Sequence, residues 1–322
     1  MKAIVHSEYG SPDVLRLQEV DPPGVGDDQV LVKVRAASVN PLDWHYMRGL
    51  PRLVRLQTGL GRPKRQRRGA DMSGVVEAVG RDVSRFQPGD EVFGEVAGSL
   101  AEYVAASEHA LAIKPVGISF QAAAAVPVAG LTALQGLRDK ARLRPGQRVL
   151  VNGASGGVGT CATQIAKALG AQVTGVTSTR NLEMVRSIGA DEVIDYTRDD
   201  FTATDRRYDV IFDTVFTKTL SAYRRVLKPD GVYVAVGAVE MGDWIGPIVH
   251  LAKVAVGSLI GSPRMVPMLA QARREDLETL AGWMASGELA PVIDRVYTLA
   301  EVPEAIRYLE EGHARGKVVI TV

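Results

Sequence analysis

The stretch that decides the fold is RVLVNGASGGVGTCATQIAKAL, residues 148–169. An apolar run at 148–151 ends in the turn Gly153-Ala154-Ser155-Gly156-Gly157-Val158-Gly159, and helical periodicity follows from 158 to 169. Glycines at such a turn allow a sharp bend and a close approach of the backbone to a pyrophosphate, while the amides at a helix start favour negative charge. The sequence therefore predicts a strand, a dinucleotide-binding loop and a helix.

The residues of this loop that we assign to the cofactor are Ala154, Ser155, Gly156, Gly157, Val158 and Gly159. The alternative is a glycine-rich connection between a strand and a helix that binds no ligand. Four glycines in this context favour the cofactor role.

The chain after this loop keeps the same alternation of strands and helices. We predict further strands at 172–176, 192–194, 209–212, 232–236 and 265–269, with helices at 183–188 and 220–227. Such alternation is typical of α/β proteins with a parallel sheet. The pattern thus predicts a doubly wound sheet of six parallel strands.

The chain before residue 113 has short apolar runs bounded by turn residues, which predicts a β-rich region. The expected strands are 2–5, 30–39, 74–79, 91–94 and 101–105. Ser119 is expected to cap an alanine-rich helix that Pro127 interrupts. Beyond 270 we expect helices at 275–286 and 303–310 and strands at 294–297 and 317–322, the last returning to the first domain. The predicted domains are 1–122 with 271–322, and 123–270.

Composition argues against several classes of partner. The 322 residues include 38 Lys and Arg against 37 Asp and Glu, so the net charge of +1 gives no broad attraction to nucleic acid or anionic membranes. The conspicuous charge run is 62–68, which we interpret as a loop. A single cysteine, Cys161, favours a reducing compartment, and the early polar residues argue against a signal peptide. We therefore expect a cytoplasmic protein without a nucleic-acid or membrane partner.

The end of the second predicted strand bears on the choice of dinucleotide. An acidic residue there would bind the ribose 2′-hydroxyl of NAD, but the sequence reads Thr177-Ser178-Thr179-Arg180. Hydroxyls and a guanidinium suit the 2′-phosphate of NADP, because arginine offers paired donors to phosphate oxygens. We predict NADPH, bound in part by Thr177, Ser178 and Arg180. The alternative is that Ser178 or Thr179 caps the next helix and Arg180 is solvated.

Several different short motifs are distributed along the whole chain. They are Val39-Asn40-Pro41-Leu42-Asp43, Gly69-Ala70-Asp71-Met72-Ser73-Gly74, Gln87-Pro88-Gly89-Asp90, Gly130-Leu131-Thr132-Ala133, the loop at 152–159, Gly189-Ala190-Asp191 with Asp195-Tyr196, and Gly316-Lys317-Val318-Val319. With these motifs the sequence resembles the zinc-independent quinone oxidoreductases, the zeta-crystallin-like branch of the medium-chain dehydrogenase/reductase superfamily.

The resemblance implies a GroES-like β-barrel catalytic domain and a Rossmann domain, with the active site in the cleft between them. It also implies a homodimer in which nicotinamide hydride adds to a quinone or to the β-carbon of an enone. Zinc-containing relatives use a Cys and the His of a Gly-His-Glu motif, where this chain has Leu42 or Asp43 and Gly69-Ala70-Asp71. Because zinc needs three nitrogen, sulfur or oxygen ligands, we expect no metal.

The resemblance also assigns individual residues. Asn40 is expected to hydrogen-bond the substrate carbonyl or the cofactor ribose, and His45 or Tyr46 to contact the enolate oxygen. The family usually has a tyrosine at the place of His45, so the proton donor is open, and His45 beside Trp44 is equally typical of packing. Thr132 and Gly237 are expected near the nicotinamide, and Tyr196 near the adenosine phosphate.

These observations predict an NADPH-dependent, zinc-independent oxidoreductase acting on a quinone or an α,β-unsaturated carbonyl. One alternative is a zinc-free alcohol/ketone oxidoreductase. It is disfavoured because nothing in the sequence replaces zinc in polarising the carbonyl. The other alternative is a regulatory protein that binds NADPH without turnover. The segment 242–262 is a candidate lid, and the substrate is not readable from it.

Overall fold

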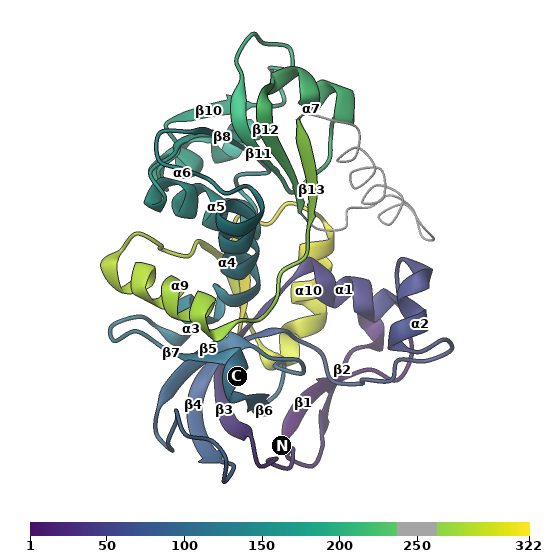
Figure 1. Ribbon diagram of the computed structural model, residues 1–322. Coiled ribbons are helices and arrows are strands. Elements are labelled where there is room, and N and C mark those ends of the chain that lie inside the picture. Colours follow the sequence, from purple (N-terminus) through teal and green to yellow (C-terminus); the bar gives the residue numbers. More distant parts are fainter. Residues whose placement is uncertain (237–262) are drawn as a thin grey trace. The chain divides into compact units, whose positions relative to one another are not determined.

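The computed structural model describes residues 1–236 and 263–322 of the chain, apart from the side chains of Val54 and Gln57 (Figure 1). The chain divides into two compact units. Unit 1 comprises Met1–Leu131, Ala272–Gly287 and Pro291–Val322, and unit 2 comprises Thr132–Gln271 with Glu288–Ala290. The assignment of catalytic and cofactor roles to separate domains, with the boundaries given above, stays a prediction.

Unit 2 is built on a six-stranded sheet in the order β10-β9-β8-β11-β12-β13, and every pairing in it is parallel. The strands are β8 (Arg148–Asn152), β9 (Gln172–Thr177), β10 (Glu192–Asp195), β11 (Tyr208–Asp213), β12 (Leu227–Val236) and β13 (Arg264–Met268). Numbered along the unit, this is the 3-2-1-4-5-6 order of the Rossmann fold. The predicted doubly wound sheet is confirmed.

Helices lie in several connections between these parallel strands. They are α5 (Gly157–Ala168), α6 (Leu182–Ser187) with the 3₁₀ turn η5 (Thr179–Asn181), and α7 (Leu220–Val226), while the π-helix η4 (Gln135–Lys140) precedes β8. Helix α5 packs on β8 and β9, α6 on β9 and β10, and α7 on β12. The core beneath them includes the fully buried rings of Tyr223 and Tyr233, whose centroids lie 4.8 Å apart.

Unit 1 contains a sheet in the order β14-β15-β3-β4-β5-β7, with β6 also pairing with β3. Its strands are β3 (Gln29–Val39), β4 (Asp71–Val79), β5 (Glu91–Glu95), β6 (Tyr103–Ser107), β7 (Leu111–Ile113), β14 (Ile293–Thr298) and β15 (Lys317–Thr321). A separate two-stranded sheet joins β1 (Lys2–Val5) to β2 (Arg16–Glu19). The strand β15 pairs antiparallel with β3, so the predicted return of the C-terminus to the first domain is confirmed.

Unit 1 also contains several helices and 3₁₀ turns. They are α1 (Pro41–Arg48), α2 (Arg55–Thr58), α3 (Phe120–Ala124), α9 (Arg274–Ser286), α10 (Val302–Glu310) and the 3₁₀ turns η1 (Pro12–Val14), η2 (Arg52–Val54), η3 (Glu108–Ala110) and η6 (Leu299–Glu301). Ser119 caps α3 as predicted, since its Oγ accepts a hydrogen bond from the Ala122 amide at 3.1 Å. Helix α4 (Pro127–Leu134) begins at Pro127 and crosses the division between the units.

The sequence pattern predicts neither β2 nor β7, and two of the predicted strands of unit 1 begin two or three residues from their expected start. Strand β4 begins at Asp71 and not at Gly74, because Asp71 and Ser73 are buried with bonded side chains and pair with β3 like apolar residues. The Ser73 hydroxyl donates to the Phe120 carbonyl at 2.6 Å. Strand β6 begins at Tyr103, since Ala101 makes only an isolated bridge to Ala3.

Gly237 and the candidate lid at 242–262 lie outside the described residues. In the parts of the chain that are described, no helix has the length and apolar character needed to cross a membrane.

Candidate cofactor and active site

The glycine-rich loop makes a tight turn between β8 and α5. The amides of Gly153 and Ala154 donate to the Val176 carbonyl at 3.2 and 3.0 Å, and the Gly156 amide donates to the Gly153 carbonyl at 3.1 Å. Gly156 is the N-cap and α5 begins at Gly157. The first amides of a helix have no partner within it, so this helix start at the carboxyl end of β8 suits an anion.

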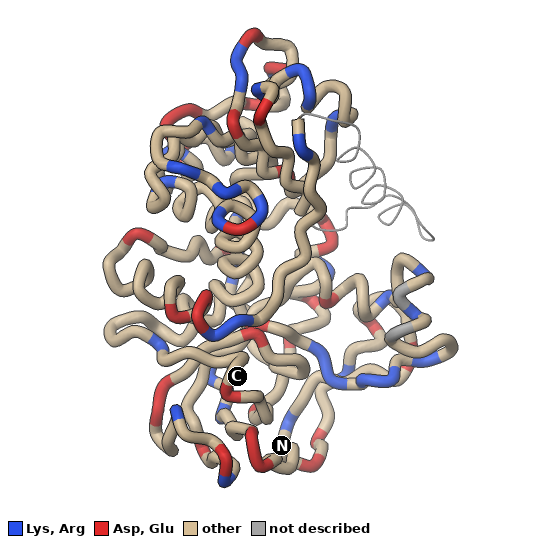
Figure 2. Tube along the Cα trace, viewed as in Figure 1, with Lys and Arg blue, Asp and Glu red and all other residues tan. Residues whose placement is uncertain are grey.

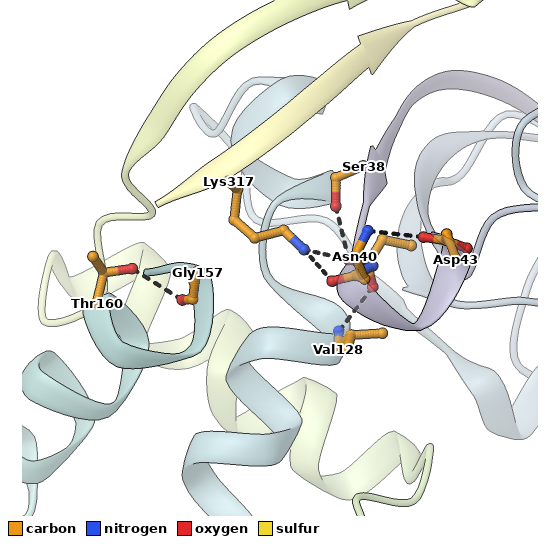
Figure 3. Close-up of polar contacts among 8 residues, drawn as sticks. Ser38, Asn40, Asp43, Val128, Gly157, Thr160 and Lys317 are labelled. Atoms are coloured by element: carbon orange, nitrogen blue, oxygen red, sulfur yellow. Dashed lines mark hydrogen bonds and ion pairs between the residues drawn. The ribbon is translucent and has the colours of Figure 1, made fainter. Parts of the chain in front are cut away.

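Two glycines are needed for this geometry. Gly153 has φ +84°, a conformation that residues with a Cβ rarely adopt. A Cβ on Gly159 would overlap the Gly153 carbonyl oxygen, so glycine at 159 lets the first turn of α5 lie against the loop. Thr160 continues the turn by donating to the Gly157 carbonyl at 3.0 Å (Figure 3). This is the close approach that a dinucleotide loop requires.

The ends of β9 and β10 meet this loop. Thr177 Oγ1 donates to Ser155 Oγ at 2.8 Å, and the Tyr196 amide donates to the Thr177 carbonyl at 3.0 Å. Asn181 Nδ2 lies 3.1 Å from Ser155 Oγ and 3.4 Å from Ser178 Oγ. The structure thus brings Ser155, Thr177, Ser178 and Tyr196 into one neighbourhood. Their role in cofactor binding stays a prediction.

Asn181 is a further residue of this neighbourhood that no sequence motif indicates. Its buried side chain joins the loop to the end of β9, and its Oδ1 is buried without a hydrogen-bond partner. Its position directly after Arg180, the predicted phosphate-binding residue, is the sequence feature that could have identified it.

The remaining predicted cofactor residues differ in exposure. Arg180 is exposed on η5, and Tyr196 is 58% exposed directly after β10. Thr132 lies within α4 and is buried, so it does not cap that helix.

A carboxylate does lie beside the end of β9, and it comes from the neighbouring strand. Asp195, the last residue of β10, is in register with Thr177. Its Oδ2 accepts from Thr179 Oγ1 at 2.5 Å, and its Oδ1 accepts from the Thr197 hydroxyl at 2.7 Å. These hydrogen bonds, the one from Thr179 foremost, hold the pKa of Asp195 below its usual value. Asp195 belongs to one of the family motifs, but the motif does not show where its carboxylate lies. The pairing of β9 with β10 places that carboxylate beside the end of β9.

In unit 1, Asn40 is the N-cap of α1 and is buried. Its Nδ2 donates to Asp71 Oδ2 at 2.8 Å, and its Oδ1 accepts a hydrogen bond from Lys317 Nζ (Figure 3). A donor on one side of the amide and an acceptor on the other fix its orientation. One of the two Nδ2 hydrogens is thereby used inside the protein.

Asp71 is the centre of this cluster. The fully buried carboxylate accepts from Ser38 Oγ at 2.7 Å, the Val128 amide at 2.8 Å and Lys317 Nζ at 3.0 Å, besides Asn40. Burial of the Lys317 and Asp71 charges is tolerated because they pair with each other, and because Asn40, Ser38 and the Val128 amide also bond to them. We assigned no role to Lys317 or Asp71 from sequence, although both stand in the quoted motifs.

Two further carboxyls lie near this cluster, that of Asp43, which is buried, and that of Glu95, which is half-buried. Asp43 Oδ2 accepts from the Asn40 amide at 2.8 Å, and burial raises the pKa of Asp43 to about 6, helped by the charge of Asp71. Burial also raises the pKa of Glu95 to about 7, again with a contribution from Asp71. Taking a carboxylate out of water disfavours its charged form.

His45 and Tyr46 lie on α1. The His45 ring stacks on Trp44 with centroids 3.7 Å apart, and Trp44 packs against the core of unit 1. Tyr46 is 38% exposed, with the Arg68 guanidinium 5.9 Å from its ring centroid. The stacking of His45 fits the packing alternative, while Tyr46 is partly exposed to solvent.

The residues near Asn40 do not fit a catalytic zinc. Ala70 has no ligating atom, and the oxygens of Asp71 are engaged by four donors. Among residues 1–236 and 263–322, no group of three or more His, Cys, Asp or Glu side chains is placed to hold a metal ion. Zinc independence itself stays a prediction.

Two family models match the chain. Residues 26–116 match the alcohol dehydrogenase GroES-like domain, which confirms the predicted fold of unit 1, and residues 188–320 match a model described as zinc-binding dehydrogenase.

Similar proteins cover nearly the whole chain. It is 36% identical to the 2-methylene-furan-3-one reductase of Solanum lycopersicum, over 99% of this chain and 79% of that protein. It is 35% identical to the chloroplastic NADPH-dependent alkenal/one oxidoreductase of Arabidopsis thaliana, with the same coverage. The structure of the quinone oxidoreductase from Coxiella burnetii superposes with a TM-score of 0.87 at 32% identity, covering 100% of this chain and 99% of that one. The chain therefore belongs to the medium-chain dehydrogenase/reductase superfamily of oxidoreductases, in its quinone oxidoreductase and alkenal/one reductase branch.

Proposed function

We propose that this protein is an NADPH-dependent, zinc-independent reductase that transfers hydride to a quinone or an α,β-unsaturated carbonyl. The observation that carries the proposal is the turn Gly153–Gly159, which opens α5 at the carboxyl end of the first strand of a Rossmann sheet. The names of the tomato, Arabidopsis and Coxiella proteins support this class of acceptor.

The chain's own residues bind and orient the dinucleotide. Amides at the start of α5 bind the pyrophosphate, and the Thr177 and Ser178 hydroxyls and the Arg180 guanidinium bind the 2′-phosphate. Tyr196, whose amide bonds to the Thr177 carbonyl, lies near the adenosine phosphate. Bound NADPH supplies the hydride, and the protein supplies position and electrostatic stabilisation.

The hydrogen-bond donors in unit 1 indicate which class of substrate accepts the hydride. Hydride addition to a conjugated acceptor leaves a delocalised enolate or hydroquinone anion, which hydrogen-bond donors stabilise without a metal. Asn40 has a second Nδ2 hydrogen after its bond to Asp71, and we assign that hydrogen to the substrate oxygen. Tyr46 is the proton donor that we favour, with His45 as the alternative.

Turnover assays on matched acceptors test the proposal. NADPH oxidation is followed with a quinone, with an enone and with the saturated ketone of the same skeleton, each with and without a chelator. We expect turnover of the conjugated acceptors only, unchanged by the chelator. Reduction of the ketone alone would establish the alcohol dehydrogenase alternative, and NADPH binding without turnover of any acceptor would establish the regulatory one.

Substitution of Asn40 tests the assigned donor. Asn40→Ala should lower kcat for an active enone about a hundredfold to a thousandfold with little change in its KM, because the lost bond stabilises developing charge. Titration of NADPH fluorescence provides the control, since the affinity for the cofactor should stay the same. If the variant instead loses affinity for NADPH at unchanged kcat, Asn40 binds the cofactor ribose.

We also propose a cytoplasmic homodimer. The single cysteine supports a reducing compartment, and the family resemblance supports the dimer. Sedimentation equilibrium of the purified chain would give twice the 34.5 kDa chain mass if this assembly is correct.

A further inference from the structure

Positive charge is concentrated in one stretch of unit 1. Residues 44–70 contain eight of the 38 Lys and Arg residues and none of the 37 Asp and Glu residues. Because the whole chain has a net charge of only +1, the remainder is net negative. The near-neutral total therefore hides a local basic region, which the blue segments around α2 mark in Figure 2.

Three of these cations are engaged within the protein. Arg48 forms a bidentate pair with Glu310 at 2.5 and 2.9 Å. The Arg55 guanidinium bonds to the Gly49 and Arg48 carbonyls, and Arg68 is buried and bonds to His6.

Four other cations face solvent, namely Arg62, Lys64, Arg65 and Arg67. The ion pairs found among the described residues include none of these four. Their charge is thus available to an external anion.

Exposed leucines occur in the same stretch. Leu53 is 39% exposed, Leu56 on α2 is 64% exposed and Leu60 is 72% exposed. A single exposed leucine is ordinary, but three within eight residues beside unpaired cations form a mixed apolar and basic surface. We call residues 52–67 the basic leucine surface.

The backbone of this surface is held by hydrogen bonds. The Gly59 amide donates to the Arg55 carbonyl at 2.8 Å, and the Lys64 amide donates to the Thr58 carbonyl at 2.7 Å. The Tyr9 hydroxyl donates to the Gly59 carbonyl at 2.7 Å. The leucines and cations are therefore presented on a folded turn that is tied to the rest of unit 1.

We propose that the basic leucine surface docks the protein on the surface of an anionic lipid bilayer. The leucines would lie at the boundary of the acyl chains, and the four exposed cations would contact lipid phosphates. A bilayer fits better than a nucleic acid because the stretch 52–67 has no aromatic residue for base stacking, while only a bilayer has an apolar layer for leucines. This inference does not depend on the proposed function.

Vesicle co-sedimentation tests the charge and leucine contributions separately. The probes are vesicles of phosphatidylcholine alone and of equal parts phosphatidylcholine and phosphatidylglycerol. The wild type should bind only the anionic vesicles, and less tightly as salt rises. The variant R62Q/K64Q/R65Q/R67Q should bind about a hundredfold more weakly or worse, because each cation near such a surface strengthens binding about fivefold. The variant L56S/L60S should bind about tenfold more weakly.

Matched controls make the same kinds of substitution outside the basic leucine surface. R85Q/R144Q/R148Q/R186Q removes four exposed cations from other surfaces, and V116S/L269S removes two residues that are 99% and 87% exposed. Both controls should bind anionic vesicles like the wild type. If either control weakens binding as much as its partner variant, the surface has no special role and the proposal fails.

A labelling experiment keeps the proposal testable if the multiple variants fold poorly. The only cysteine, Cys161, is buried, so L60C can be labelled selectively with an environment-sensitive fluorophore. Its emission should shift to shorter wavelength on addition of anionic vesicles, while the same label on V116C should not shift. Absence of a shift at 60 would overturn insertion of the leucine surface.

Short duplex DNA provides the competing outcome. If the wild type binds DNA as tightly as anionic vesicles at the same salt concentration, and L56S/L60S binds vesicles like the wild type, the surface is a general polyanion site. That pair of results would also overturn the proposal.

Discussion

Arg180 is the residue on which the predicted choice of NADPH depends most. It is exposed on η5, the 3₁₀ turn that directly follows Thr177 and Ser178. Arg180→Ala should raise KM for NADPH about tenfold, because a charge-assisted phosphate contact in this exposed setting is worth on the order of 1.5 kcal/mol. KM for NADH should stay nearly unchanged, since NADH lacks the 2′-phosphate.

Steady-state kinetics with both cofactors measure this effect. Arg186→Ala, which removes an exposed cation from the neighbouring helix α6, is the matched control and should change neither KM. An equal loss for NADPH and NADH would refute the assignment.

The carboxylate of Asp195 disfavours the 2′-phosphate that Arg180 is predicted to bind. Thr179 donates its hydroxyl hydrogen to Asp195 and so presents only lone pairs to a ligand. Asp195 is ionised at neutral pH, as an aspartate with an ordinary or lowered pKa is, and this negative charge repels a phosphate but tolerates a ribose hydroxyl. Asp195→Asn should therefore raise kcat/KM for NADPH several-fold relative to that for NADH.

The ratio of kcat/KM for the two cofactors is the measurement. Asp199→Asn, an exposed carboxylate four residues later, should leave the ratio unchanged. A ratio that moves toward NADH in Asp195→Asn would show that the carboxylate helps to hold the loop and does not repel phosphate.

At the scale of elements, the start of α5 depends on the missing side chain at 159. Gly159→Ala should lower the free energy of unfolding by about 1–3 kcal/mol and weaken NADPH binding, because the new Cβ meets the Gly153 carbonyl and forces the helix away from the loop. Gly282→Ala is the matched control within α9. A Cβ at 282 has nothing within 4 Å, so this change should stabilise the protein by about 0.5–1 kcal/mol.

Urea unfolding and NADPH titration of both variants check this prediction. Unchanged cofactor affinity in a folded Gly159→Ala protein would mean that the position of α5 against the loop is irrelevant to binding.

Elements with strong periodicity were predictable from the sequence, and their boundaries were less so. The helix predicted at 158–169 is Gly157–Ala168, and the strand predicted at 148–151 is Arg148–Asn152. Strand β4 was predicted to begin three residues late because Asp71 and Ser73 have the polarity of a turn. Only the partners that satisfy their side chains make them strand residues, and those partners are distant in the sequence.

At the scale of the molecule, the buried carboxyl of Asp43 makes stability depend on pH. Its pKa is raised from 3.8 to about 6 by burial, with Asp71 raising it further and Lys317 and Arg68 opposing. The folded protein holds the Asp43 proton more tightly than the unfolded chain does. The resulting stabilisation is fully present below pH 3.8 and is lost as the pH rises through 6. The wild type should therefore lose about 2–3 kcal/mol of stability between pH 4 and 7 relative to Asp43→Asn.

Urea unfolding of both proteins across this pH range gives the difference directly. Asparagine keeps an oxygen that accepts from the Asn40 amide, so α1 should keep its N-cap. The titrations of Glu95 and His6 are common to both proteins and cancel in the difference. A difference that is constant with pH would show that Asp43 stays ionised throughout.

The sequence by itself determined the Rossmann sheet, the phosphate loop and the return of the last strand to unit 1, because periodicity, glycine spacing and family motifs are local signals. The tertiary structure alone decided what surrounds Asn40 and Thr179. Lys317 reaches Asn40 across 277 positions of sequence because β15 pairs with β3, and Asp195 meets Thr179 because β10 pairs with β9. A buried charge needs a partner, and strand pairing, which no local pattern encodes, chooses which partner it has.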